Sequence, residues 1–455
     1  MLFNSIEFII FFIIVTQIYF ILPFKSRWLL LLIVSCYFYM VFIPQYILIL
    51  FITIITDYFA GIFIENAIGQ RRKIYLIISL ISNIGFLAFF KYYNFFSDNV
   101  SLLLNFLNVS YRPPNIDIIL PIGLSFHTFQ AMSYTIEVYR KMQKAEHHFG
   151  IYALYVMFYP QLVAGPIERP QNLIHQFYEN HIFDFNRVKS GLKLMLWGMF
   201  KKVVIADRLC VFVDKVYNNP TNYEGFPLIL ATVFFAFQIY CDFSGYSDIA
   251  IGAARVMGFK LMTNFNRPYF SKSIGEFWKR WHISLSTWFK DYLYIPIGGS
   301  KVSLFRHQFN LFFTFLISGL WHGANWTFVA WGALNGFYLI LENLTWNFRN
   351  DITTLIGLNK VPYIHKFIKI IITFSLTNIA WVFFRANNIS DALYIISHMF
   401  FGWDKFLNNI ANAAVINKYI FLDQPHIQFV VAILSIGFME SIHLIQSRRS
   451  ISEFI

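Results

Sequence analysis

The chain has 455 residues, of which 57% are hydrophobic, 20% aromatic and only 13% charged, and its net charge is +12 at pH 7. Soluble domains hold roughly 25% charged residues, so this composition excludes a water-soluble body of this size and requires membrane lipid as the main solvent. The basic residues fall between apolar stretches, as in the cytoplasmic loops of membrane proteins, so the positive charge indicates no nucleic acid partner.

Apolar stretches that could cross a bilayer recur along the chain. The first is expected to be a retained span, because its first residues carry Glu7 and no positive charge, and no small-residue cleavage site follows the apolar run. The expected membrane segments are 5–23, 27–43, 45–64, 74–92, 118–139, 150–165, 190–208, 227–250, 309–343, 365–385 and 427–445. We therefore predict an all-α polytopic membrane protein, a single domain over residues 1–455, with about ten to twelve transmembrane or re-entrant helices and additional interfacial helices.

The distribution of basic loops predicts the orientation. Alternate early loops are basic, which places them in the cytoplasm and the N-terminus outside. The stretch 255–306 carries nine basic residues against two acidic ones and should also be cytoplasmic. Simple alternation of spans would place this stretch outside, so one segment between 150 and 250 is expected to be re-entrant, which requires protein or a water-filled cavity around it.

The segment 309–343 has two apolar halves separated by a short polar stretch at 321–325. Gly323 permits a helix break or a close backbone approach, and Asn325 can cap a second helix. This pattern places His322 deep in the membrane, beside a break in the helix. A histidine there is a candidate proton acceptor for a hydroxyl, and the alternative is a histidine that only hydrogen-bonds between helices.

The segment 276–291 is basic and aromatic. Its aromatic and leucine side chains fall on one helical stripe: Phe277, Trp281, Leu285 and Trp288. This spacing predicts a helix at the cytoplasmic interface with its aromatic residues at headgroup level. His282 lies at the edge of the stripe and could face inward as a second functional residue, or could be structural.

Two further polar motifs can be explained by a structural role as well as by a functional one. Asp242 and Asp248 suggest an acid–base pair or a cation site, and the alternative is that they pair with Arg or Lys from the stretch 255–306. The pair Glu168 and Arg169 lies in a proline-bounded turn, for which a structural role is favoured.

Several motifs together resemble the membrane-bound O-acyltransferase family. They are Leu120–Phe129, Val163–Pro170, Asp242–Ala250, Phe265–Tyr269, Phe277–Ser286, Asp291–Gly299 and Gly319–Trp326. They occur in the family's order and extend over most of the chain. Within the family they are most similar to the bacterial members that acetylate alginate and peptidoglycan, and more distantly to those that attach D-alanine to teichoic acids.

The resemblance implies that His322 is the catalytic histidine and His282 a second catalytic position. It also implies a central funnel through the bacterial inner membrane, with no bound cofactor and with a cytoplasmic acyl donor, such as acetyl-CoA or an acyl carrier, as cosubstrate. The acyl group would pass to a polysaccharide, with a separate extracytoplasmic esterase-like partner for final transfer. Two alternatives stay open: D-alanyl transfer to teichoic acid, and a transporter or flippase of a glycan intermediate that makes no bond.

Overall fold

A computed structural model describes residues 1–109, 111, 113–117, 121, 123–163, 165–408 and 412–448. Within these ranges the structure contains helices and no strand. The chain folds into two compact units. The first unit is Met1–Trp197 with Tyr246–Thr263, and the second is Gly198–Gly245 with Asn264–Ile455. α10 (Phe185–Met199) and α12 (Phe226–Met257) each contribute residues to both units.

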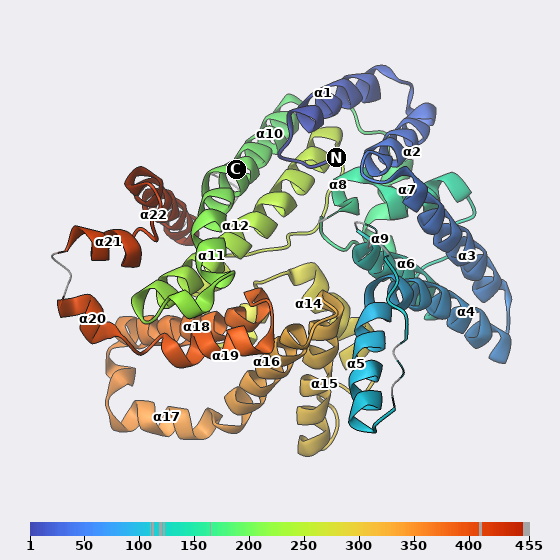
Figure 1. Cartoon of the computed structure of the whole chain (residues 1–455). Coiled ribbons are helices and arrows are strands. Elements are labelled where there is room, and N and C mark those ends of the chain that lie inside the picture. Colours follow the sequence, from blue (N-terminus) through green and yellow to red (C-terminus); the bar gives the residue numbers. More distant parts are fainter. Residues whose placement is uncertain are drawn as a thin grey trace. The chain divides into compact units, whose positions relative to one another are not determined.

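The chain consists of helices of widely differing length (Figure 1). Five helical stretches of the described chain are long and apolar enough to cross a bilayer: Pro44–Asn66, Gln70–Phe106, Phe226–Met257, Pro362–Arg385 and His426–Gln446. The predicted all-α polytopic membrane protein is therefore confirmed, whereas the single domain and the central funnel stay predictions. The expected span 118–139 begins on residues 118–120 and 122, which lie outside the described residues, and its helix is observed from Leu124.

The first unit contains most of the N-terminal helices. They are α1 (Ile6–Ile21), α2 (Phe24–Met40), α3 (Ile47–Asn66), α4 (Gln70–Leu87), α5 (Tyr93–Phe106), α6 (Leu124–Tyr139), α7 (Phe149–Met157), α8 (Tyr159–Leu162) and α9 (Pro170–Leu173). A π-helical turn at Ala88–Tyr92 joins α4 to α5, so the expected span 74–92 continues as a longer helical stretch.

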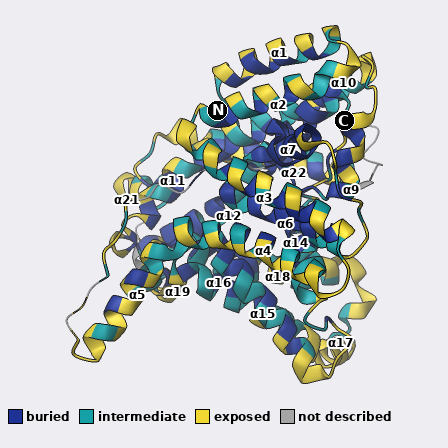
Figure 2. Cartoon of the chain, turned by 90° about the vertical axis from the view of Figure 1, so that its right-hand side faces the viewer, coloured by how far each residue is buried: buried dark blue, intermediate teal, exposed yellow. Residues whose placement is uncertain are grey.

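The range 150–250, in which a re-entrant segment is expected, begins with two short helices, α7 and α8; their course relative to the membrane stays a prediction. α7 has nine residues and therefore extends about 14 Å, which is less than half of a bilayer core. It is buried from Gly150 to Met157, and Figure 2 shows the helix largely in dark blue. Where the helix breaks at Phe158, the freed N–H of Tyr159 donates to Ser35 Oγ at 3.0 Å. Surrounding protein thus satisfies the broken backbone, as lipid could not.

The turn after α8 is held by Glu168, which is fully buried. Its carboxyl accepts hydrogen bonds from the Met262 N–H and from Asn172 Nδ2, and Tyr155 Oη donates to its backbone carbonyl at 3.0 Å. Burial raises the pKa of Glu168 to about 7. These contacts give Glu168 the structural role that the sequence favoured for this turn.

The second unit contains most of the C-terminal helices. They are α11 (Asp207–Tyr217), α13 (Ile274–Trp278), α14 (Ile283–Phe289), α15 (Leu304–His322), α16 (Trp326–Leu344), α17 (Trp346–Leu355), α18 (Pro362–Arg385), α19 (Ile389–His398), α20 (Trp403–Asn408), α21 (Ala413–Tyr419) and α22 (His426–Arg448). The break expected within 309–343 is confirmed, because α15 ends at His322 and Asn325 caps α16 by accepting the Thr327 N–H at 2.9 Å.

The ion pair of Asp242 corrects one expectation. Its carboxylate lies 2.6 Å from Lys202 Nζ, and the same ammonium lies 2.8 Å from Asp207. The partner therefore comes from the π-helical segment Phe200–Ala206, and the expected source in the stretch 255–306 was wrong for this residue. Gly245 allows α12 to lie close to the segment that carries Lys202, because a Cβ at this position would lie 2.8 Å from the Gly198 carbonyl oxygen.

α15 and α16 pack closely through facing glycines, and Figure 1 shows the two helices side by side. A Cβ on Gly319 would lie 2.3 Å from the Phe328 carbonyl oxygen, and one on Gly332 would lie 2.4 Å from that of Phe315. Only hydrogen fits at both positions, so the two backbones approach each other as small residues allow in membrane helix pairs.

Replacing Gly332 by Ala should therefore destabilise the protein by about 2 kcal/mol, since the added methyl group overpacks a backbone contact. Thermal unfolding of the purified protein in detergent would measure the loss. Gly437→Ala is the matched control, because nothing lies within 4 Å of a Cβ at that position of α22. We expect the control to unfold at or slightly above the wild-type temperature; equal melting of Gly332→Ala and wild type would contradict the close packing.

Candidate functional site

His322 is the last residue of α15, immediately before the break that separates this helix from α16. Its imidazole lies among aromatic rings, with centroid distances of 4.8 Å to Trp321, 5.0 Å to Trp331 and 5.2 Å to Phe384. The side chain is half-buried, so part of the ring is accessible to a reactant. The sequence thus placed His322 correctly at a break between two apolar helices.

His282 lies between α13 and α14, where the sequence predicted one continuous interfacial helix. That prediction was wrong, since the helix breaks at residues 279–282 and His282 adopts a left-handed conformation with φ 43° and ψ 56°. The predicted lipid-facing stripe is also wrong, because its side chains are buried within the protein: Phe277, Trp281, Leu285 and Trp288. The stripe packs into an aromatic cluster, in which Phe277 and Trp281 stack at 5.5 Å.

Asn264 holds the backbone and the ring of His282. Its Oδ1 accepts the Ser284 N–H at 3.2 Å and the Ser284 Oγ–H at 2.9 Å, and its backbone carbonyl accepts the Ile283 N–H at 2.8 Å. The left-handed conformation costs a residue with a Cβ about 1 to 2 kcal/mol, and these bonds offset that cost. Asn264 carries no local pattern that would single it out in the sequence, because its role depends on a loop that approaches His282 from 18 residues away.

The contact with Asn264 also fixes the tautomer of His282. His282 Nδ1 lies 3.1 Å from Asn264 Oδ1, an oxygen that already accepts an N–H, so Nδ1 must carry the proton. Burial, and after it the charge of nearby His322, lowers the pKa of His282 well below its usual range. His282 is therefore a neutral imidazole whose basic nitrogen is Nε2.

The structure brings the two candidate histidines into one aromatic cluster. The Trp321 ring lies 4.8 Å from His322 and 6.5 Å from His282, measured between centroids. The two residues differ in access, since His282 is 1% exposed and His322 is half-buried. In this arrangement His322 can meet a reactant directly, whereas His282 can polarise or orient groups from within the protein.

A cavity of about 400 Å³ lies beside this cluster, bounded by α13, α14, α15 and α16. Its polar lining includes Ser286, Thr314 and Ser318, and Lys279 and Lys290 also border it. Ser318 lies one helical turn before His322 on α15, so the cavity follows the helix face that ends at this histidine. The buried Trp278 Nε1–H, which also lines it, has no hydrogen-bond partner within the described ranges and could donate to a bound molecule.

Across the described residues, no three side chains of His, Cys, Asp or Glu are grouped to hold a metal ion. The site instead offers two imidazoles, aromatic walls and an adjoining cavity with hydroxyl groups. Such an arrangement suits proton transfer to and from a hydroxyl or thiol.

Comparison with known proteins gives one matching family and three similar relatives. Residues 134–384, which include both histidines, match the sequence profile of the MBOAT, membrane-bound O-acyltransferase family. The chain is 39% identical over 409 residues to the "Probable alginate O-acetylase AlgI" of Pseudomonas aeruginosa, covering 88% of this chain and 75% of that protein. It is 33% identical over 467 residues to the "Peptidoglycan O-acetyltransferase" of Helicobacter pylori, covering 94% and 85%. A "Teichoic acid D-alanyltransferase" of Streptococcus thermophilus is 28% identical over 235 residues, covering 49% and 56%.

Asn264 offers a test of the geometry at His282. Replacing it by Ala would leave buried N–H and O–H donors of His282 and Ser284 without their acceptor, which should destabilise the protein by about 3 kcal/mol. Thermal unfolding in detergent measures this loss, and Asn347→Ala, at an exposed position of α17, is the matched control. An Asn264→Ala protein that melts with the control would contradict the assigned hydrogen bonds.

Proposed function

Because the chain belongs to the membrane-bound O-acyltransferase family, we propose that it moves an acetyl group from a cytoplasmic thioester donor toward hydroxyls of a cell-envelope or extracellular polysaccharide. The enzyme class, an O-acyltransferase, follows from the family and from relatives named for O-acetylation. Acetyl is favoured over D-alanyl as the transferred group, because the O-acetylating relatives match at higher identity and over more of the chain than the D-alanyltransferase does.

The observation that carries the proposal is the pairing of His322 with His282 around Trp321. A transporter or flippase needs a polar pathway, but it does not need two imidazoles of different access held beside a helix break. We infer that His322 is the catalytic histidine. His282, neutral and held by Asn264, is a second catalytic position that tunes the first.

The proposed step is an acyl transfer assisted by a base. His322 accepts the proton of the acceptor hydroxyl while the hydroxyl oxygen attacks the carbonyl carbon of the thioester. The carbon–sulfur bond breaks, and the thiolate leaves with the proton that His322 returns. The aromatic walls exclude water from the carbonyl, which protects the thioester from hydrolysis.

The cavity beside α15 is the proposed route for the donor. Lys279 and Lys290 lie at its border, where they would attract a phosphate-bearing donor such as acetyl-CoA or an acyl carrier. The hydroxyls of Thr314 and Ser318 then lead along one face of α15 toward His322. A narrow donor arm therefore reaches the histidine from the basic stretch 255–306.

The proposed setting is the bacterial cytoplasmic membrane, with the N-terminus outside and the stretch 255–306 in the cytoplasm. The acceptor then lies across the bilayer from the donor. A separate extracytoplasmic esterase-like protein is the proposed partner that completes transfer to the polysaccharide.

Replacing His322 by Ala tests the catalytic assignment. We expect at least a 100-fold loss of acetyl transfer, since general acid–base help contributes about 10²- to 10⁴-fold. The measurement is the acetyl content of envelope polysaccharides in cells that carry only the variant, normalised to the amount of the protein in the membrane. His398→Ala is the matched control, because its ring stacks on Tyr394 within α19 and should not affect transfer. Undiminished acetylation by His322→Ala would overturn the assignment.

Filling the cavity tests the donor route. Ser318→Phe places a ring in the cavity one turn before His322 and should lower acetyl transfer at least about tenfold by excluding the donor arm. Ser318→Ala keeps the cavity open and should retain most of the activity. Full acetylation by the Phe variant, at equal membrane levels, would mean that the donor arrives by another path.

A further inference from the structure

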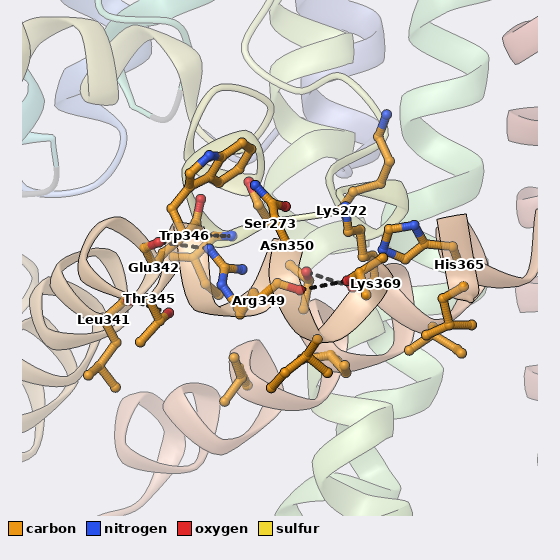
Figure 3. Close-up of a pocket in the computed structure, with 18 of the residues that line it drawn as sticks. Lys272, Ser273, Leu341, Glu342, Thr345, Trp346, Arg349, Asn350, His365 and Lys369 are labelled. Carbon is orange, nitrogen blue, oxygen red and sulfur yellow. Dashed lines mark hydrogen bonds between the residues drawn. The ribbon is translucent and has the colours of Figure 1, made fainter. Parts of the chain in front are cut away.

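A second cavity of about 390 Å³ lies in the second unit between α16, α17 and α18, and the acyl-transfer proposal does not use it. Its walls are largely apolar, with Tyr338 and Leu341 from α16 and with Ile368 and Ile372 from α18. Figure 3 shows Leu341, Thr345, Trp346 and Arg349 on one side, with His365 and Lys369 on the other. The cavity therefore combines an apolar interior with cationic groups from separate helices.

The charges at this cavity are unbalanced. Lys272, Arg349 and Lys369 line it, and within the described chain none of them lies within 4 Å of a carboxylate oxygen. Its one lining carboxylate, on Glu342, is engaged by α13: Oε2 accepts the Ile274 N–H at 2.7 Å and the Gly275 N–H at 3.2 Å. The cations thus keep their capacity to bind an anion.

The position of Arg349 is fixed by its own helix turn. One Nη donates to the Glu342 backbone carbonyl at 2.7 Å, and the guanidinium lies 6.0 Å from the Trp346 ring centroid. The guanidinium has five N–H donors, of which this hydrogen bond uses one, and the side chain lines the cavity. Arg349 can therefore serve as a preoriented anion ligand, since guanidinium geometry suits phosphate oxygens.

The helices around the cavity have the length and the exposed side chains expected of helices that lie at a membrane surface. α17 has ten residues, none of them buried, and extends about 15 Å, which is too short to cross a bilayer. Large aromatic side chains are exposed there and at the start of α18, including Trp346, Phe348, Tyr363 and Phe367. Exposed aromatic rings beside basic residues are typical of the headgroup level of a membrane.

We propose that this cavity is a binding site for an anionic phospholipid. Its phosphate contacts Arg349 and Lys369, with Lys272 at the rim, while an acyl chain lies against Ile368, Ile372 and Leu341. A free phosphate would satisfy the charges but leave the apolar walls in water, and a zwitterionic lipid would leave the cations without a net negative partner. The combination of the two linings selects a lipid with a net negative head.

Native mass spectrometry of the full chain, purified in mild detergent, tests this proposal. The probes are phosphatidylglycerol and phosphatidylethanolamine with identical acyl chains. We expect wild type to retain phosphatidylglycerol in preference, and Arg349→Gln with Lys369→Gln to reduce its retention about tenfold. Lys360→Gln with Lys366→Gln removes two charges from the same region at positions outside the cavity lining, and this control should bind as wild type does.

Three results would overturn the proposal. They are equal phosphatidylglycerol retention by the Arg349 and Lys369 double variant and its control, equal retention of the two lipids by wild type, and displacement of the lipid by millimolar inorganic phosphate or acetyl-CoA. Arg349→Lys with Lys369→Arg keeps both charges and should retain the lipid, which separates charge loss from misfolding. His322→Ala should bind the lipid fully, so the outcome is independent of the acyl-transfer assignment.

Discussion

The packing of α15 against α16 through Gly319 and Gly332 is the contact on which the site depends. Neither position has room for a Cβ, so the two backbones meet directly and the end of α15 is fixed against its neighbour. His322 is the last residue of that helix, and its imidazole rests on Trp331 of α16. A membrane offers no hydrophobic force to drive two apolar helices together, so close backbone contact supplies the rigidity that catalysis needs.

The second histidine reaches the same cluster by a different device. His282 occupies a break between two short helices, in a backbone conformation that is unfavourable for it, and Asn264 satisfies the groups that the break exposes. In a membrane protein, irregular backbone away from water is tolerated only where other parts of the protein surround it. At His282 the buried aromatic cluster around Trp281 provides these surroundings. Each histidine therefore lies at a helix break. Asn325 caps the helix that follows the break at His322, and Asn264 stabilises the break at His282 by hydrogen bonds.

Local sequence signals predicted part of this arrangement. The break at 321–325 was predictable because glycine and a capping asparagine interrupt an apolar run. The re-entrant segment expected between 150 and 250 stays a prediction. The aromatic stripe at 277–288 led to a wrong prediction of an interfacial helix, because helical spacing does not distinguish a lipid-facing stripe from a buried aromatic cluster. Asn264 and Lys202 were beyond prediction, since each acts on residues far away in sequence and neither carries a local signature. The role of His322 itself still rests on the proposal.

The most direct measurement of that role is an experimental structure of the full chain with a non-hydrolysable thioether analogue of acetyl-CoA. We expect density for the donor arm in the cavity lined by Trp278, Thr314 and Ser318, with its acyl end within hydrogen-bonding distance of His322. Donor density elsewhere on the protein, with neither histidine near the acyl carbon, would contradict it.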